Sequence, residues 1–341
     1  MLKQPSLLSK ANIAYVIVLL VMIAIPLILD SRTMTILLTQ FCIFAILAMS
    51  YDLLLGYTGI ISFGHAMFFG LGAYSTAIIL SDYGPTVGVF AISIVVGIII
   101  SSIVSAICGA LTLRLKSHFY AMFTLAISGL FLVVAEKWRS VTRGNDGFTF
   151  RAPEIFRERL YFYFLVLVCL VVVFILLKRL VASPFGKVLV AIRENEQRTR
   201  SLGYKTLGYK IIASVIAGAI ASLAGSLYVI SLRFVNTSVL TMDITLDALM
   251  MTIIGGVGTL IGPIIGAGVI EFAQHYLSGL ARDYPIFERW IIFFGILYIL
   301  AVIFFPKGIV GTVYIRYHSW KMKRQKNKEP KVIPPKKEIP Q

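Results

Sequence analysis

The sequence predicts an all-α polytopic membrane protein, and two observations carry this prediction. The first is composition: 58% of the 341 residues are hydrophobic and 14% are charged, whereas soluble domains contain about 25% charged residues. A soluble core of this length could not bury so much apolar surface. The second is that the apolar residues form separate runs, each close to the roughly 20 residues that a membrane-crossing helix needs.

About ten of these runs are expected to be transmembrane helices. They cover about residues 11–29, 35–55, 60–80, 87–113, 119–135, 161–177, 211–231, 244–261, 264–280 and 290–305. No small-residue cleavage site follows the first run, which is therefore interpreted as a retained span rather than a secretory signal. A re-entrant or broken form remains an alternative for 119–135 and for the two runs that meet at GGVGTLIGP.

The distribution of lysine and arginine predicts the orientation of the transmembrane region 11–305. With both termini inside, the cytoplasmic segments hold 22 of the 32 lysines and arginines, as the positive-inside rule requires. The main cytoplasmic segments are then the N-terminus (1–10), a loop (178–210) and a basic, proline-rich tail (306–341) that is expected to be disordered, while 136–160 is an external loop. The net charge of +16 is thus a signature of topology, and nucleic acid is not an expected partner.

The order of the helices is the one expected of an inverted repeat. The group of spans two to five starts on the outside, and the group of spans seven to ten starts on the inside. Two such groups of opposite orientation are the commonest plan of transporters. Glycine-rich stretches at 56–72 and 255–268 fall at comparable places in the two halves. This order favours a transporter architecture.

No enzyme signature is found along the chain. The phosphate loop GxxxxGK[ST], the zinc motif HExxH and the nucleophile motif GxSxG are missing from the sequence. The four histidines (65, 118, 275 and 318) are too scattered to predict a zinc site. The protein is therefore expected to be non-catalytic and to hold no metal or cofactor.

The stretch DLLLGYTGIISFGHAMFFGLGAYSTAIIL, residues 52–80, differs from a plain membrane helix. Gly59 lies in the turn between the second and third runs, and Gly64 lies within the third. Glycines let helices pack closely, and they also permit a break that neighbouring protein covers. The stretch is therefore expected to form either a closely packed helix or a discontinuous helix beside a translocation path.

Six residues are candidates for lining such a path. An ionisable side chain at membrane depth faces protein or water, so His65 is either a neutral structural histidine or a substrate contact. Glu271 shares one helical face with Gln274 and His275, either in a hydrogen-bonded cluster or as a path residue. The candidates are Gly59, Ser62, Gly64, His65, Tyr74 and Glu271.

The loop 178–210 is expected to contain a helix. Pro184 ends any helix that continues from the sixth run, Lys187 to Ser201 has helix-forming composition, and Gly203 is a stop signal. One side of this helix would be modestly apolar and the rest highly charged. It is either a solvated basic helix or a docking helix for a cytoplasmic partner.

Three stretches resemble one family of membrane proteins. DLLLGYTGIISFGHAMFFGLGAYSTA is similar to the signature of the LivM-type permease subunits of ATP-binding-cassette importers for branched-chain amino acids. SPFGKVLVAIRENEQRTRSLGY and TIIGGVGTLIGPIIGA follow in the order and spacing of the same family. The resemblance covers about residues 35 to 305.

The resemblance implies a non-catalytic permease in a prokaryotic plasma (inner) membrane. Its implied partners are two cytoplasmic ATP-binding-cassette ATPase subunits, a second, LivH-like permease subunit, an extracytoplasmic substrate-binding protein and membrane lipid. The segment from Glu196 to Gly203 corresponds to the EAA coupling loop that fits a groove on the ATPase, although Gln197, Arg198 and Thr199 stand where the EAA residues are expected. The implied ATPase-coupling candidates are Phe185, Gly186, Arg193, Glu194, Glu196 and Gly203.

Two alternatives remain open at this stage. Relatives that carry urea or short amides share the same motifs, so the substrate is either a branched-chain amino acid or a related small amide. The other alternative is a stand-alone ion- or proton-coupled secondary transporter. It would need acidic or ion-coordinating residues within the membrane, for which Glu271 is the candidate.

Overall fold

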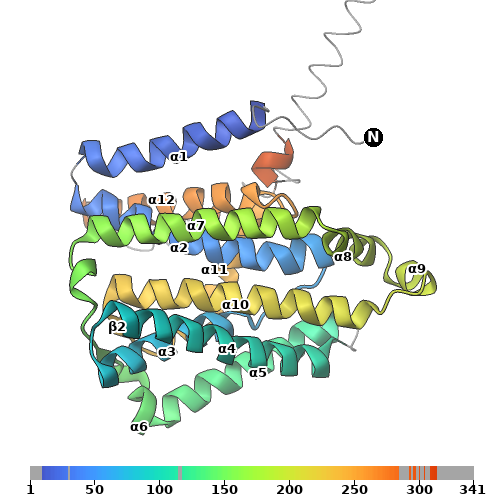
Figure 1. Cartoon of the computed structure of the whole chain (residues 1–341), viewed down its shortest axis with the longest axis horizontal. Coiled ribbons are helices and arrows are strands. Elements are labelled where there is room, and N and C mark those ends of the chain that lie inside the picture. The colour runs from blue at the N-terminus through green and yellow to red at the C-terminus, as the bar shows by residue number, and fades with distance from the viewer. Residues whose placement is uncertain are drawn as a thin grey trace, which may run out of the picture.

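A computed structural model describes residues 10–29, 31–113, 117–283, 292, 295–296, 299, 303 and 308–312. These residues form an all-α protein apart from one short strand pair, so the expected all-α class is confirmed, while the inverted repeat stays a prediction. Most of the long helices lie side by side in a bundle (Figure 1). The N-terminus (1–10), the tenth run (290–305) and the tail (306–341) lie wholly or largely outside the described residues.

Nine long helices account for most of the described chain. They are α1 (Lys10–Leu29), α2 (Arg32–Asp52), α3 (His65–Tyr83), α4 (Val87–Thr112), α5 (Ser117–Lys137), α7 (Arg159–Ala182), α10 (Thr206–Leu232), α11 (Met242–Gly255) and α12 (Ile261–Asp283). Each of the first nine apolar runs overlaps one of these helices. The prediction that the eighth run reaches residue 261 is wrong, because α11 ends at Gly255 and α12 begins at Ile261. The number of membrane crossings and their orientation stay predictions.

Five helical segments are long and apolar enough to cross a membrane, judged by length and composition within the described ranges. These are Arg32–Thr58, Val87–Thr112, Phe119–Lys137, Arg159–Ala182 and Thr206–Leu232. The chain is therefore a multi-pass membrane protein. The first of these segments, which contains α2, is the central one, because 72% of its most apolar part is buried, against 22% for α4. Many apolar side chains of α4, among them Ile92, Val95 and Ile103, are consequently exposed on the outside of the bundle.

Small residues hold α3, α4 and α10 together. Gly72 of α3 packs on the backbone of Ser222 in α10, where an added methyl group would lie 2.7 Å from the Ser222 Cα atom. Ser226 Oγ donates a hydrogen bond to Gly72 O (3.1 Å), and Ser101 Oγ donates one to Gly218 O (2.8 Å). Such close backbone approach and hydroxyl bonding are typical of membrane helix packing. Of the two alternatives for the glycine-rich stretch, close packing therefore applies to Gly72.

The segment 136–160 is folded rather than extended. It contains α6 (Arg139–Thr142), the short helices η2 (Gly144–Asp146) and η3 (Glu154–Phe156), and the strand β1 (Phe148–Thr149). This strand pairs antiparallel with β2 (Phe234–Val235), which precedes the short helix η4 (Thr237–Leu240). The strand pair ties the predicted external loop to the chain that leaves α10.

Candidate substrate path and coupling segment

A broken segment, rather than a simple turn, joins α2 to α3. The α2 helix continues into the π-helical turn η1 (Leu53–Thr58), and Gly59 then adopts a left-handed conformation with φ +71°. Residues 59–64 are not helical. The prediction that the third run begins at residue 60 is therefore wrong: α3 begins at His65, and Gly64 caps it instead of lying within it. Glycine is the residue that adopts this backbone conformation readily, so helix formation stops at Gly59.

Neighbouring helices satisfy the backbone amides that the break releases. Thr124 Oγ1 of α5 accepts a hydrogen bond from Phe63 N–H (3.2 Å), and Thr245 Oγ1 of α11 accepts one from Ala66 N–H (2.8 Å). Irregular backbone at membrane depth is tolerated only where protein or a cavity covers it. Residues 59–64 therefore form a covered, non-helical connection between α2 and α3, and its place beside a translocation path stays a prediction.

Four of the six path candidates lie in or beside this broken segment: Gly59, Ser62, Gly64 and His65. Ser62 is buried, its carbonyl oxygen accepts a hydrogen bond from Tyr51 Oη (3.0 Å), and its Oγ accepts one from Gly64 N–H (3.4 Å). These bonds fix the geometry of the segment from within.

His65 is completely buried at the first turn of α3. Its Nε2 lies 2.8 Å from Ser50 Oγ, and Ser50 Oγ donates its only hydrogen to Leu47 O at 2.6 Å. This assigns the hydrogen to Nε2, which donates it to Ser50, and in the neutral ring Nδ1 is then an acceptor. Nδ1 has no hydrogen-bond partner among the described residues. An unpaired buried acceptor beside the break is suited to meet a donor on a ligand.

The other two path candidates, Tyr74 and Glu271, lie elsewhere. Tyr74 is buried farther along α3, and its hydroxyl has no partner in the described part of the chain. Glu271 is buried in α12, whereas His275 on the same helix is exposed. No hydrogen bond joins Glu271 to Gln274 or His275, so the hydrogen-bonded cluster that was one alternative for this face is not formed. No group of three or more metal-ligating side chains occurs in the described ranges.

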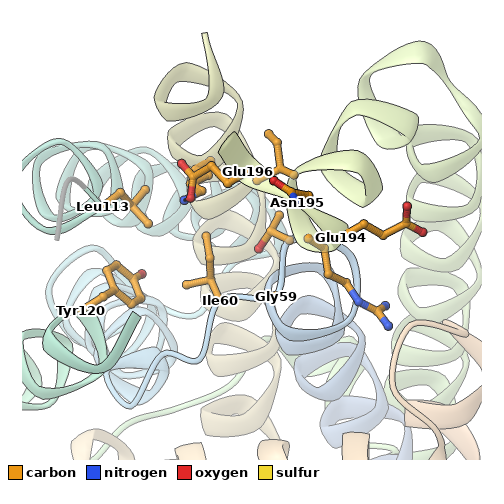
Figure 2. A pocket seen from close by; sticks show the side chains of 11 residues that line it. Gly59, Ile60, Leu113, Tyr120, Glu194, Asn195 and Glu196 are labelled. Carbon is orange, nitrogen blue, oxygen red and sulfur yellow. Dashed lines mark hydrogen bonds and ion pairs between the residues drawn. The ribbon is translucent and has the colours of Figure 1, made fainter. Parts of the chain in front are cut away.

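A hollow of about 300 Å³ lies between the broken segment and the loop 178–210. The residues that Figure 2 labels come from the break (Gly59, Ile60), from the chain around the α4–α5 connection (Leu113, Tyr120) and from the loop (Glu194, Asn195, Glu196). One path candidate, Gly59, and three ATPase-coupling candidates, Arg193, Glu194 and Glu196, therefore border the same hollow.

The helix α8 (Pro184–Glu194) begins the candidate coupling segment. Ser183 Oγ caps it by accepting from Gly186 N–H (3.4 Å), and Pro184 occupies the first turn, where its missing N–H is not needed. Gly186 lies against the backbone of Val181, which an added methyl group would overlap. The Phe185 ring stacks on Tyr209 of α10 at 5.5 Å between centroids. The start of α8 is thus fixed to both flanking long helices.

A second short helix, α9 (Glu196–Ser201), follows directly. Asn195 Oδ1 caps it by accepting from Arg198 N–H (2.9 Å). The expectation of one continuous helix from 187 to 201 is therefore wrong, because Asn195 is extended and its side chain starts a new helix. Gly203, with φ +90°, follows the end of α9 as predicted. Both helices lie at one end of the bundle (Figure 1).

Glu196 anchors α9 to the start of α10. Its carboxylate accepts from Lys210 Nζ (2.5 Å) and Thr206 Oγ1 (3.1 Å), and Arg200 Nη2 lies 3.4 Å away. Partial burial acts to raise the pKa of Glu196, but the hydrogen bond and charge of Lys210, with help from Thr206 and Arg200, outweigh burial and lower the pKa. Glu196 is therefore ionised and bound at neutral pH.

The sequence reasoning missed Asp52, the last residue of α2. This side chain is completely buried, and its carboxylate accepts from the backbone N–H groups of Gly258 (2.6 Å) and Leu260 (3.1 Å) in the turn between α11 and α12. The available signal was an acidic residue at the edge of an apolar run, which at membrane depth indicates a partner within the protein. The partners are backbone N–H groups, and no side-chain motif in the sequence predicts them.

The arrangement of apolar helices, a broken segment and a crosswise helix pair at one end of the bundle is that of a membrane permease. Residues 33–302 match a family model described as the permease component of branched-chain amino acid transport systems. The match covers most of the chain, which therefore belongs to this family.

Three relatives extend the comparison, each over most of its own length. The high-affinity branched-chain amino acid transport system permease proteins LivM of Salmonella typhimurium and Escherichia coli are each 25% identical, over 80% and 88% of this chain and 68% and 75% of their own. The probable branched-chain amino acid transport permease protein LivM of Methanocaldococcus jannaschii is 26% identical over 79% of this chain and 91% of its own. The chain is thus of the LivM type. No solved structure matches it significantly.

Proposed function

We propose that the chain is the transmembrane permease subunit of an ATP-binding-cassette importer that translocates branched-chain amino acids across a prokaryotic plasma (inner) membrane. The family and the names of the three relatives support this substrate class. The observation that carries the importer assignment is the α8–α9 pair, which lies across one end of the bundle and is bound to its long helices at both of its own ends. A non-catalytic role follows, since ATP hydrolysis belongs to partner subunits.

The α8–α9 pair is the proposed docking site for one of two cytoplasmic ATPase subunits. Leu189 and Ile192 are buried against the bundle, whereas Lys187, Glu194 and Gln197 are exposed. The exposed side chains are free to contact a protein, and the anchored side transmits a rigid-body displacement to the bundle. A LivH-like permease subunit completes the translocation path, and an extracytoplasmic binding protein delivers the substrate.

The broken segment 59–64 is the proposed border of the substrate path. The hollow beside Gly59 lies at the same end of the bundle as the coupling segment. In this proposal the hollow is the cytoplasmic end of the substrate path. His65 follows the broken segment in the chain, and its Nδ1 is an unpaired acceptor. When the path opens, this atom accepts a hydrogen bond from the ammonium group of an amino acid.

The test is affinity purification of the chain from its own membranes in mild detergent, followed by reconstitution of the eluate in proteoliposomes. We expect ATPase subunits and a second permease to co-purify, and leucine uptake to require both ATP and the binding protein. If the complex transported urea and not leucine, the substrate would be a small amide instead of a branched-chain amino acid. Uptake that persists without ATP and follows the membrane potential would overturn the importer, and Glu271 would then be the residue to replace.

A further inference from the structure

The two glycine-rich stretches of the sequence meet in the structure. An added methyl group at Gly56 would lie 2.7 Å from the Gly258 Cα atom, so the π-helical turn η1 and the turn 256–260 are in direct backbone contact. Asp52 ties this contact together from inside, through its two bonds to Gly258 N–H and Leu260 N–H. A break after α2 and a turn after α11 are thus held as one unit.

Arg193, in the last turn of α8, reaches into the same unit. Its Nη1 donates a hydrogen bond to Gly56 O. The side chain runs past two glycines on the way: an added methyl group would lie 3.2 Å from Arg193 Cγ at Gly59, and 3.0 Å from Arg193 Nη1 at Gly258. The space that the arginine occupies is therefore available because three glycines surround it.

Arg193 also supplies a charge that the buried carboxylate needs. Asp52 is completely buried, and burying an ionised carboxylate is unfavourable unless hydrogen bonds and an opposite charge compensate for it. Among the described residues, Arg193 is the cation that acts electrostatically on Asp52. The hydrogen bond to Gly56 O and the attraction to Asp52 hold the end of α8 to both glycine turns at once.

We propose that Arg193 is the positioning residue that couples the ATPase-docking helix to the substrate path, by making α8, the broken segment and the turn 256–260 move as one body. The inference rests on the proposed function, because it requires that α8 receive the ATPase displacement. Glu196 anchors the neighbouring helix α9 to α10 through Lys210. Arg193 is the separate connection that leads to the break beside His65.

The test uses the complete importer in proteoliposomes with its binding protein, and it measures leucine uptake per ATP hydrolysed. Arg193→Met keeps the unbranched apolar stem of the side chain and removes the guanidinium group, with its charge and its hydrogen bond to Gly56 O. We expect uptake per ATP to fall roughly tenfold, the size of one lost hydrogen bond to a charged group, while the complex still assembles and hydrolyses ATP. The matched control is Lys205→Met, which removes an exposed positive charge from the same end of the bundle. It is expected to retain the coupling of the unmodified complex.

A second arm tests the link to the buried carboxylate. Asp52→Asn combined with Arg193→Met removes both charges. Arg193 is itself exposed, but its loss alone leaves the buried Asp52 carboxylate without an opposite charge, whereas the double variant has no buried charge to compensate. The double variant is therefore expected to recover part of the coupling that Arg193→Met loses. A merely structural role for Arg193 would lower the amount of assembled complex without changing uptake per ATP.

The outcomes separate this proposal from the proposed function. If the unmodified chain neither binds ATPase subunits nor shows ATP-dependent uptake, the proposed function fails. If the unmodified complex works and Arg193→Met couples as well as Lys205→Met, only the coupling role of Arg193 fails. An Arg193→Met chain that no longer bound the ATPase would also overturn the proposal, since it would assign Arg193 to docking.

Discussion

Asp52 Oδ1 accepts a hydrogen bond from the backbone N–H of Gly258 at 2.6 Å, although 206 residues separate the two in the sequence. The bond joins the end of α2 to the turn between α11 and α12. Because a buried carboxylate can accept from two amides at once, one side chain holds both the middle of this turn and its last residue.

Replacement of Asp52 by asparagine is predicted to destabilise the protein. Asparagine has one carbonyl oxygen, so its NH₂ group would face a backbone N–H and leave a buried donor unsatisfied. The expected loss is about 1–3 kcal/mol, visible as a lower melting temperature in detergent. Asp82→Asn is the matched control, because Asp82 is exposed near the end of α3. Equal melting temperatures for the two variants would contradict the assigned role.

Replacement of Gly72 by alanine is predicted to disrupt the packing of α3 on α10. The new methyl group would overlap the backbone of Ser222, which cannot move independently of its helix. Overpacking of this kind typically costs about 1–3 kcal/mol, and thermal unfolding measures it. Gly129→Ala is the control, since nothing lies within 4 Å of a methyl group there. We expect Gly129→Ala to unfold at or slightly above the temperature of the unmodified chain.

Replacement of His65 is predicted to impair uptake more than assembly. His65→Ala removes both the hydrogen bond to Ser50 and the unpaired Nδ1 acceptor. His65→Asn is the sharper variant, because its amide retains one donor and one acceptor in a smaller side chain. Leucine uptake and the yield of assembled complex are measured together. If His65→Ala left both intact, the histidine would be structural and the path would not pass this residue.

Glu196 gives a prediction with a defined pH dependence. Its pKa is lowered from 4.5 in the folded protein, so the stabilisation it provides is present above that pH and is lost as the pH falls through the folded pKa. The side chain is 36% exposed, which limits the effect to less than about 1 kcal/mol. The melting temperature of Glu196→Gln should therefore fall below that of the unmodified chain near neutral pH, and the difference should vanish in acid. A difference that persisted in acid would assign the stabilisation to packing.

Glu154→Gln is the control for this pH dependence. Glu154 faces Arg157 at 4.0 Å, but its side chain is 87% exposed. Ion pairs between such exposed groups contribute little to stability. The variant is expected to melt with the unmodified chain across the same pH range.

The helix order was predictable because hydrophobic run length and glycine punctuation are local properties. Nine runs became α1 to α5, α7 and α10 to α12, and Pro184 and Gly203 ended helical segments as their backbone chemistry requires. The errors were also local. The third run was begun too early because the non-helical residues 60–64 include the apolar Ile60, Ile61 and Phe63. Asn195 was not recognised as the cap that divides α8 from α9.

Half of the candidate site followed from the sequence in the same way. Gly59, Ser62, Gly64 and His65 lie together because they are neighbours in the chain, and Glu194 and Glu196 lie in the segment whose motif suggested coupling. The sequence could not place Gly59 against the same hollow as Glu194 and Glu196. It also gave no reason to separate Tyr74 and Glu271 from them, since burial alone does not specify a neighbour.

The sequence by itself determined that the protein lies in a membrane, because 58% of its residues are hydrophobic. Its glycine-rich signature also indicated one family of permeases. Tertiary structure decided which glycines break a helix and which pack it, and it brought Asp52 and Arg193 to the same turn. The physical reason is that backbone amides are identical in every residue. A carboxylate that binds Gly258 N–H therefore has a partner that only the folded chain can identify.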